Sequence, residues 1–300
     1  MPNGRRWPCV SWLISTVENE KFMIKQRESA AHAVILELEA GTFDKDLARD
    51  LAARALRDND YGTKYTVLRI NPVAEGMGRL DLEAALGSRP AAVMLPKIHD
   101  AAEVEEADEL VGDIEERSGI PRGSTEFAIM METANCIFEV REIARASRRT
   151  RALCFGPGDY TAEIGTRFTY GTAYPAEPGL EVLAARSLVV AGCRATGVTA
   201  IDGPTMVSVR DTRSLLRHAW QSRALGFEGM IVLSPTQVAP VHEAFAPSPD
   251  EVGHARRALA LYESAQQSGA GVVGADAEMI SATVAEQYRD VLRRAESLAR

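Results

Sequence analysis

The sequence has few cysteines and histidines, and neither set has the spacing of a metal centre or a disulfide framework. Its four cysteines, Cys9, Cys136, Cys154 and Cys193, stand far apart and form no CxxC motif. The five histidines show no ligand spacing either, and we expect them at the surface. A chain of 300 residues can bury a core that needs no disulfides, so we expect reduced structural thiols.

Basic charge and long apolar runs are also lacking, which excludes two further classes of protein. The formal net charge is −8 at pH 7, and a nucleic-acid partner would require a basic face to neutralise phosphates. No apolar run approaches the ~18 residues that a membrane span requires. Arg5 and Arg6 resemble the start of a signal peptide, but Glu18, Glu20 and Lys21 interrupt any apolar core after them. We expect a cytoplasmic protein.

Eight short apolar runs are present, and they alternate with helical segments. The runs lie at 11–15, 33–39, 65–71, 91–98, 127–132, 152–159, 198–204 and 230–235. The clearest helical segments between them lie at 45–59, 101–118, 137–147, 180–196 and 212–225. Most runs are continuously apolar, which is typical of strands covered on both faces by helices. Eight such units predict a parallel sheet closed into a (β/α)8 TIM barrel, which we place in one catalytic domain over residues 1–245.

The chain beyond residue 245 is longer than one closing helix needs. Ser248 or Asp250 is suited to cap a helix that runs to about residue 267. A stretch rich in glycine and alanine follows to residue 277, and a last helix is predicted over 282–300. We expect a C-terminal helical extension over 246–300 that serves as a lid or an oligomer arm, or simply packs on the barrel.

Polar side chains stand at or just after the C-terminal ends of six predicted strands. They are Glu37 and Glu39, Arg69 and Asn71, Lys97, Glu132, Asp159 and Asp202. In a barrel these ends converge on one rim, where active sites are built. A single acidic residue at such a place is as often the N-cap of the next helix, but capping does not explain six strands that end in polar groups. The sequence therefore predicts an active site at this rim.

Longer motifs connect the chain to a known family. They read VLRINP at 67–72, VMLPKI at 93–98, MMETANCI at 130–137, LCFGPGDYTAEIG at 153–165, AIDGP at 200–204, ALGFEGMIVLSPTQV at 224–238 and AFAPSPDEV at 244–252. In this order and spacing they are specific, and the chain resembles the citrate lyase β-subunit-like branch of the HpcH/HpaI aldolase superfamily. The resemblance extends from about residue 11 to residue 294, almost without gaps.

The resemblance implies a metal site and a set of catalytic residues. Glu132 and Asp159 match the glutamate and aspartate that hold Mg²⁺, a hard cation that takes one or two carboxylates and keeps several waters; Mn²⁺ is the alternative ion. Arg69 matches the arginine that grips the carboxylate of a keto acid. Glu39 matches one member of an acidic pair that orients metal-bound water in the relatives. Arg69, Glu39 and, from the same segment, Glu37 are our predicted catalytic residues, whereas Glu132 and Asp159 are the predicted metal ligands.

The implied reaction is the Mg²⁺-dependent cleavage of a carbon–carbon bond in a 3-hydroxyacyl-CoA-like substrate, giving an oxo acid and an acyl thioester, or the reverse condensation. The expected partners are a small keto acid and an acyl-CoA or related thioester, bound by a homo-oligomer (trimer or hexamer). We assign Arg69, Pro96, Lys97 and Gly156 to substrate binding. For Lys97 an ion pair with a rim carboxylate is favoured over a Schiff base, the other role of lysines in barrel aldolases.

Several positions depart from the family pattern. The first strand lacks the usual arginine, with Val10 in its place, and Ala40 replaces the last acid of the usual Asp-Leu-Glu-Asp motif. In the tail, Ser281 replaces an aspartate that serves as proton donor or acceptor in relatives, so Asp276, Glu278 or another group would have to act instead. These departures leave open a homologue that acts on a non-CoA substrate or as a thioesterase, or a catalytically impaired binding subunit.

Overall fold

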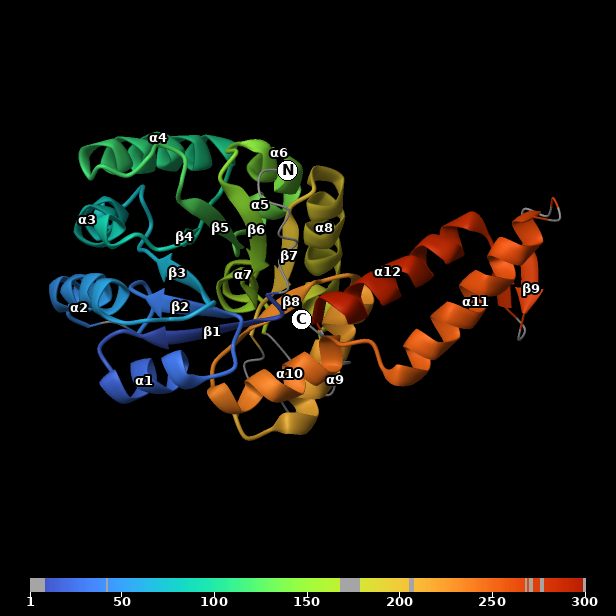
Figure 1. Cartoon of the computed structure of the whole chain (residues 1–300). Helices are drawn as coiled ribbons and strands as arrows, with labels where there is room; N and C mark the ends of the chain where they lie inside the picture. Colours follow the sequence, from blue (N-terminus) through green and yellow to red (C-terminus); the bar gives the residue numbers. More distant parts are fainter. Residues whose placement is uncertain are drawn as a thin grey trace. The chain divides into compact units, whose positions relative to one another are not determined.

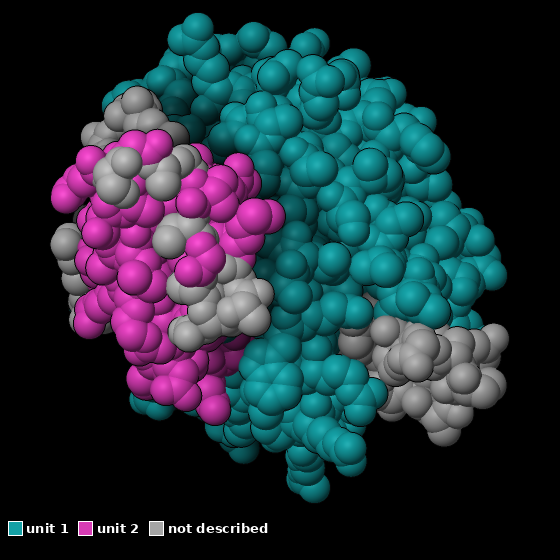
Figure 2. Space-filling model, turned by 90° about the vertical axis from the view of Figure 1, so that its right-hand side faces the viewer, with its two compact units in different colours: residues 1–242 teal, residues 243–300 magenta. Residues whose placement is uncertain are grey.

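The computed structural model describes residues 9–41, 43–167, 179–204, 208–267, 269, 272–275 and 278–298. The chain forms two compact units, residues 1–242 and residues 243–300, which Figure 2 colours separately. The division falls after residue 242, within α10 (Val238–Phe245), whereas the sequence analysis placed the end of the barrel domain at residue 245.

The first unit contains a closed barrel of eight strands that follow one another in chain order (Figure 1). The strands are β1 (Ser11–Thr16), β2 (Ala33–Glu37), β3 (Tyr65–Arg69), β4 (Ala92–Leu95), β5 (Glu126–Met131), β6 (Thr150–Phe155), β7 (Thr199–Asp202) and β8 (Gly229–Val232). Every neighbouring pair is parallel, and β1 pairs with β8 to close the ring. The predicted (β/α)8 barrel is confirmed.

Helices between the strands lie around the outside of this barrel (Figure 1). They are α1 (Glu20–Glu28), α2 (Lys45–Asp58), α3 (Met77–Ala85), the 3-10 turn η1 (Leu86–Ser88), α4 (Ala101–Arg117), α5 (Ala134–Phe138), α6 (Val140–Arg145), α7 (Pro157–Glu163), α8 (Leu180–Thr196), α9 (Thr212–Leu225) and the 3-10 turn η2 (Pro235–Gln237). Asp44, Asp100 and Asp211 cap α2, α4 and α9, each accepting a hydrogen bond from the backbone N–H three residues later.

Two predicted boundaries differ from the structure. The apolar run at 152–159 is not one strand, because β6 ends at Phe155 and Pro157 starts α7, whose fixed φ suits the first turn of a helix. Asp159 therefore belongs to a helix rather than to a strand end. The helix predicted over 137–147 is two short helices, which meet at Glu139 where the backbone leaves the helical region.

Alternate residues of the strands fill the inside of the barrel with large and small apolar side chains. They are Trp12, Ala33, Ile35, Val67, Ala92, Met94, Ala128, Met130, Ala152, Cys154, Ile201 and Ile231. Trp12 is the largest of them and is fully buried. Because side chains alternate between the two faces of a strand, the next inward positions along β2, β3 and β5 are Glu37, Arg69 and Glu132. The apolar core is therefore followed, at the C-terminal ends of these strands, by charged side chains.

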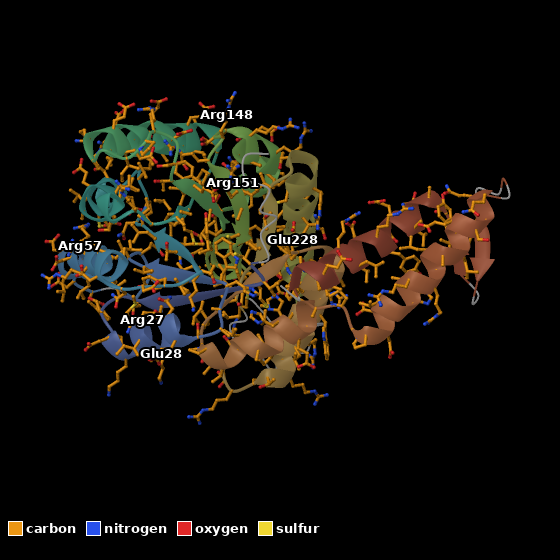
Figure 3. All side chains as sticks on the ribbon, in the orientation of Figure 1. Arg27, Glu28, Arg57, Arg148, Arg151 and Glu228 are labelled. Atoms are coloured by element: carbon orange, nitrogen blue, oxygen red, sulfur yellow. The ribbon has the colours of Figure 1, made fainter. Side chains whose placement is uncertain are left out.

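Ion pairs close the opposite end of the barrel, where the strands begin. Glu126, at the start of β5, pairs with Arg151 of β6 at 2.7 Å and accepts a hydrogen bond of 2.8 Å from the Tyr65 hydroxyl. Figure 3 labels Arg151. Glu228, just before β8, pairs with Arg194 of the outer helix α8 at 3.3 Å. These contacts stabilise the fold and lie away from the polar ends of the strands.

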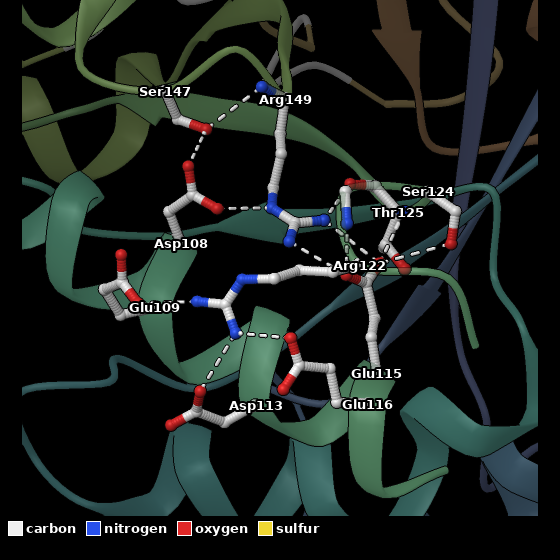
Figure 4. Close-up of polar contacts among 11 residues, drawn as sticks. Asp108, Glu109, Asp113, Glu115, Glu116, Arg122, Ser124, Thr125, Ser147 and Arg149 are labelled. Carbon is white, nitrogen blue, oxygen red and sulfur yellow. Dashed lines mark hydrogen bonds and ion pairs between the residues drawn. The ribbon is translucent and has the colours of Figure 1, made fainter. Parts of the chain in front are cut away.

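A buried ion-pair network attaches α4 to the chain on either side of β5 (Figure 4). Arg149, just before β6, pairs with Asp108 and with Glu115, the latter at 2.8 Å, and Glu115 also accepts the Thr125 N–H at 2.7 Å. Glu115 and Arg149 are both buried. On the exposed side of the same helix, Arg122 spans three further carboxylates.

The second unit is a helical hairpin with its own small core. It contains α11 (Pro249–Gln267), α12 (Ala282–Leu298) and a two-stranded antiparallel sheet, β9 (Val273–Ala275) and β10 (Glu278–Ile280), which the sequence analysis did not predict. Ser248 and Glu251 form a reciprocal capping box at the start of α11, so Ser248 is the cap. Ser281 caps α12 by accepting the Val284 N–H at 3.4 Å. Asp276 lies outside the described residues.

All four cysteines are free and at least partly buried, as expected. Burial raises the pKa of Cys9 and of Cys193 to about 12, so these thiols stay protonated near neutrality and are poor nucleophiles. Across the described part of the chain, no helix combines the length and apolar character needed to cross a membrane.

Candidate active site

We call the end of the barrel formed by the C-terminal ends of the strands the barrel mouth. There the predicted rim residues of β2 and β3 meet in a buried ion-pair network. Arg69 is 7% exposed and donates from Nη1 to Glu37 at 3.0 Å and from Nη2 to Glu39 at 3.0 Å. Its Nη2 also lies 3.6 Å from Glu132. Although burial disfavours the charged form, the three carboxylates raise the pKa of Arg69, so the guanidinium is always charged. Its buried Nε has no partner among the described residues.

Glu37 is fully engaged by protein groups. Its Oε1 accepts the backbone N–H groups of Glu39 and Ala40 at 2.6 and 3.1 Å, while its Oε2 pairs with Arg69. Burial raises the pKa of Glu37 despite these partners. Glu37 therefore fixes both the turn that carries Glu39 and the orientation of Arg69. Its predicted place in the catalytic group stays a prediction.

A second buried network holds the end of β3, and the sequence analysis missed its central residue. Asp81 of α3 is fully buried and accepts both the backbone and the side-chain N–H of Asn71, each at 2.7 Å. Its other oxygen pairs with Arg49 at 2.7 Å, and Asn71 donates to the Leu38 carbonyl at 3.1 Å. An aspartate within a helix gives no sequence signal of this role, because most such residues face solvent.

Glu132 follows β5 and is 1% exposed. Its Oε1 accepts the backbone N–H of Lys97 at 2.9 Å. Its Oε2 faces Gly156, where a Cβ atom would come within 2.5 Å of that oxygen, so any larger residue there would displace the carboxylate. Burial raises the pKa of Glu132 to about 7, and the negative charge of Asp159 adds to this shift. Thr133, not Glu132, caps α5, so helix capping does not account for this acid.

Asp159 lies in the first turn of α7, and its side chain is exposed. The carboxylates of Asp159 and Glu132 are near enough for the former to affect the pKa of the latter. Among the residues that the structure describes, no cluster of three or more His, Cys, Asp or Glu side chains is present, so this site offers two carboxylates. A pair of oxygen donors beside an open helix start fits Mg²⁺, which keeps most of its waters, and does not fit a closed Zn²⁺ site.

Lys97 completes the mouth from the loop after β4, next to the buried Pro96. Its Nζ lies 2.9 Å from Glu39 Oε1, which confirms the predicted ion pair with a rim carboxylate. The hydrogen bond to Glu39 raises the pKa of Lys97, which disfavours the neutral amine that a Schiff base requires. The backbone of Lys97 has φ of 51°, in the left-handed region that residues other than glycine rarely adopt.

Asp202 does not belong to this site, although it ends β7. It follows Ile201, an inward residue, so its side chain points outward to the helices, where it pairs with Arg186 at 2.5 Å and accepts the Ser222 hydroxyl at 2.6 Å. His218 also contacts Asp202, at 3.2 Å, and is buried, so the expectation that all histidines lie at the surface is wrong. Burial opposes ionisation, but Arg186 and His218 hold the pKa of Asp202 well below its usual range.

The chain is similar in sequence to proteins of known activity. The chain is 31% identical over 294 residues to (3S)-malyl-CoA thioesterase of Cereibacter sphaeroides strain KD131, covering 97% of this chain and 96% of that one. It is 30% identical over 267 residues to the citrate lyase subunit beta of Leuconostoc mesenteroides subsp. cremoris, covering 88% and 86%.

A crystal structure of the protein CitE from Mycobacterium tuberculosis, in complex with magnesium, acetoacetate and coenzyme A, aligns with a TM-score of 0.78 at 29% identity, over 96% of this chain and 98% of that one. Residues 11–235 match the sequence family described as HpcH/HpaI aldolase/citrate lyase. The chain therefore belongs to the HpcH/HpaI aldolase/citrate lyase family and is an enzyme of the carbon–carbon lyase type.

Proposed function

We propose that this protein is a Mg²⁺-dependent lyase that cleaves a 3-hydroxyacyl-CoA-like substrate into an oxo acid and an acyl thioester, or condenses the two. The observation that carries the proposal is the grouping of Glu132, Asp159 and Arg69 at one mouth. The CitE complex with magnesium, acetoacetate and coenzyme A supports the same ligand chemistry here.

Glu132 and Asp159 would hold the cation, with Glu132 Oε2 as the oxygen on the side of α7. Lys97 N–H already occupies Oε1 of Glu132, so the two oxygens of this carboxylate have different roles. When bound, Mg²⁺ would act as a Lewis acid for the oxygen of the substrate that becomes a carbonyl.

Arg69 would bind the carboxylate of the oxo-acid half. Its guanidinium is held in place by Glu37 and Glu39, and its buried Nε is a donor that no described residue satisfies. A substrate carboxylate would supply the missing acceptor, at little cost in side-chain ordering.

Glu39 would accept the proton of the substrate hydroxyl as the carbon–carbon bond breaks. Its side chain is 12% exposed, more open than Glu37 and Glu132 at 4% and 1%. The electron pair of the broken bond passes to the thioester, whose α-carbon then takes a proton, so that the products are the oxo acid and the acyl thioester. Ser281, which stands where relatives have an aspartate, has no pKa suited to delivering this second proton, so another group supplies it.

The test is an assay of the purified protein with Mg²⁺ against malyl-, citramalyl- and citryl-CoA, following the oxo acid and the acyl-CoA separately. We expect both products in equal amounts from at least one substrate. Glu132→Gln should abolish turnover, whereas Glu106→Gln, the same change on an exposed face of α4, should not. Turnover that survives Glu132→Gln would refute the proposal.

Thioester hydrolysis is the second candidate, favoured by the 31% identity to a malyl-CoA thioesterase across nearly the whole chain. The same assay separates the two activities. Hydrolysis releases free CoA thiol and the intact hydroxy acid, whereas lyase activity releases an oxo acid and leaves the thioester in the product.

A further inference from the structure

Lys97 combines two features that the proposed reaction does not explain. It is one of two non-glycine residues with positive φ in the described part of the chain, the other being Arg89. Such a backbone is unfavourable for a side chain with a Cβ atom, and it persists where surrounding contacts hold it. Lys97 also brings an ammonium group into a mouth that already contains a buried arginine.

The backbone conformation of Lys97 has a direct consequence for Glu132. It directs the Lys97 N–H to Glu132 Oε1 at 2.9 Å, on the same side of the carboxylate as Arg69. Gly156 lies against the other oxygen, Oε2. One oxygen of Glu132 is therefore taken up by the protein, and the other is presented toward β6 and α7.

The side chain of Lys97 holds the carboxylate of Glu39 in place. The two oxygens of Glu39 are divided between two cations: Oε1 lies 2.9 Å from Lys97 Nζ and Oε2 lies 3.0 Å from Arg69 Nη2. Arg69 is itself fixed by Glu37. Removing the ammonium group would thus release one oxygen of Glu39 beside Glu132.

We propose that Lys97 is a positioning residue that limits the Mg²⁺ site to two carboxylates, because its ammonium group holds Glu39 away from the cation while its backbone fixes Glu132. The inference rests on the proposed function, since it assumes Mg²⁺ between Glu132 and Asp159. It adds that the ammonium group of Lys97 keeps Glu39 available for the substrate. Lys97 therefore lowers the affinity of the site for Mg²⁺, because affinity for a hard cation rises with the number of charged oxygen ligands.

The experiment measures Mg²⁺ binding by isothermal titration calorimetry on the whole chain without substrate, so it does not depend on turnover. We expect Lys97→Met to bind Mg²⁺ roughly three- to tenfold more tightly than the wild type, since one nearby positive charge is lost and one carboxylate oxygen is gained. Lys97→Gly should bind at least as tightly and should fold well, because glycine tolerates the positive φ. Lys97→Arg, which keeps the charge, should bind like the wild type.

Lys45→Met is the matched control, since Lys45 Nζ donates to the backbone carbonyls of Leu38 and Glu39, at 2.6 and 2.7 Å. It removes the same formal charge beside the segment that carries Glu39 without releasing a carboxylate oxygen, and its Mg²⁺ affinity should stay close to that of the wild type. Equal tightening in Lys45→Met and Lys97→Met would overturn the inference, because the effect would then be one of general charge. Unchanged or weaker binding by Lys97→Met would overturn it as well.

Glu132→Gln separates this inference from the proposed function. If the wild type binds Mg²⁺ and Glu132→Gln does not, the metal site stands, and the comparison of Lys97→Met with the wild type decides the role of Lys97 alone. If the wild type binds and Glu132→Gln binds equally well, the proposed site is wrong. If none of these proteins binds Mg²⁺, both conclusions fall.

Discussion

At the scale of single residues, the position of Glu132 depends on the absence of a side chain at residue 156. A Cβ atom there would lie 2.5 Å from both Cβ and Oε2 of Glu132, well inside van der Waals contact. Glu132 is buried and held by the Lys97 N–H, so it cannot move aside without losing that hydrogen bond. Glycine at 156 therefore serves the geometry of the carboxylate.

Gly156→Ala should weaken Mg²⁺ binding by about tenfold or more, because groups that orient a metal ligand typically have effects of this size. It should also cost roughly 1–3 kcal/mol in the free energy of unfolding, as overpacking does. Calorimetric titration and urea unfolding measure the two effects. Gly158→Ala is the control, since a Cβ at 158 meets nothing within 4 Å. Equal metal affinities in the two variants would contradict the prediction.

Arg69→Lys should lower kcat/KM at least ~10-fold although the charge is kept, because an ammonium group lacks the planar fork that binds Glu37, Glu39 and a substrate carboxylate together. Steady-state kinetics with the best substrate from the lyase assay tests this. Arg148→Lys, a change at an exposed arginine (Figure 3), should leave kcat/KM unaltered. A fully active Arg69→Lys enzyme would contradict the requirement for a guanidinium group at this position.

At the scale of elements, α4 is attached to the barrel by an ion-pair network with a buried and an exposed half (Figure 4). Glu115 is buried and binds Arg149 and the Thr125 N–H, whereas its neighbour Glu116 pairs with the partly exposed Arg122. A buried carboxylate that loses its charge leaves its cation uncompensated in a low dielectric, while solvent screens an exposed pair.

Glu115→Gln should therefore reduce the free energy of unfolding by about 3 kcal/mol, the usual effect of breaking a buried pair from one side. Glu116→Gln, one residue along the same helix, should cost less than about 1 kcal/mol. Urea unfolding of both variants by circular dichroism compares them directly. Similar losses in the two would mean that burial does not set the strength of this network.

The helix α10 is joined to the beginnings of β1 and β2 by a pair of partly buried histidines. The rings of His32 and His242 stack with centroids 4.3 Å apart, His242 Nε2 lies 2.7 Å from the Ser11 hydroxyl, and His32 Nδ1 accepts the Val10 N–H. Burial, with some contribution from His32, lowers the pKa of His242 to about 4, and burial lowers that of His32. Both rings are neutral in the folded protein at pH 7.

Below the ordinary histidine pKa of about 6.5, the unfolded chain takes up protons that the folded chain excludes, so this pair makes stability fall as pH drops from about 6.5 toward 4. His242→Gln should flatten that part of the pH dependence of the unfolding free energy relative to the wild type. His99→Gln, at an exposed histidine, should leave it unchanged. If the unfolding free energy of His242→Gln depended on pH as steeply as that of the wild type, the stacked pair would not contribute to this dependence.

At the scale of the whole molecule, the mouth carries more acid than base. Glu37, Glu39 and Glu132 contact the two cations, Arg69 and Lys97, and Asp159 adds a fourth negative charge that acts on Glu132 and Lys97. A divalent ion that binds only the folded arrangement would relieve this imbalance and shift the unfolding equilibrium of the chain.

Mg²⁺ at about ten times its dissociation constant should raise Tm by roughly 2 °C, since such linkage contributes about 1.4 kcal/mol in a domain of this size. Differential scanning calorimetry with and without the ion measures the shift. Glu132→Gln should show no shift, and the same ionic strength from NaCl should not reproduce it. A shift that survives Glu132→Gln would place the ion elsewhere on the protein.

Much of this architecture could be predicted from local patterns. The alternation of buried runs with helical segments predicts eight parallel strands, and α8 and α9 have the predicted bounds. One boundary was misplaced: the predicted run at 152–159 joins β6 to the start of α7, although Gly156 and Pro157 mark the break between them. The hairpin of β9 and β10 is hidden in a segment of small residues, which have little propensity for strands.

The sequence by itself determined the closed barrel, the family and the rim on which polar side chains gather, because periodicity and motif spacing are properties of the chain alone. Only the tertiary structure decided which rim residues face one another. Side chains alternate along a strand, so Glu132 follows the inward residue Met130 by two and enters the mouth, whereas Asp202 follows the inward Ile201 by one and pairs with Arg186 outside it. The roles of Asp81 and of the Lys97 backbone likewise depend on contacts between segments distant in sequence, which no local pattern encodes.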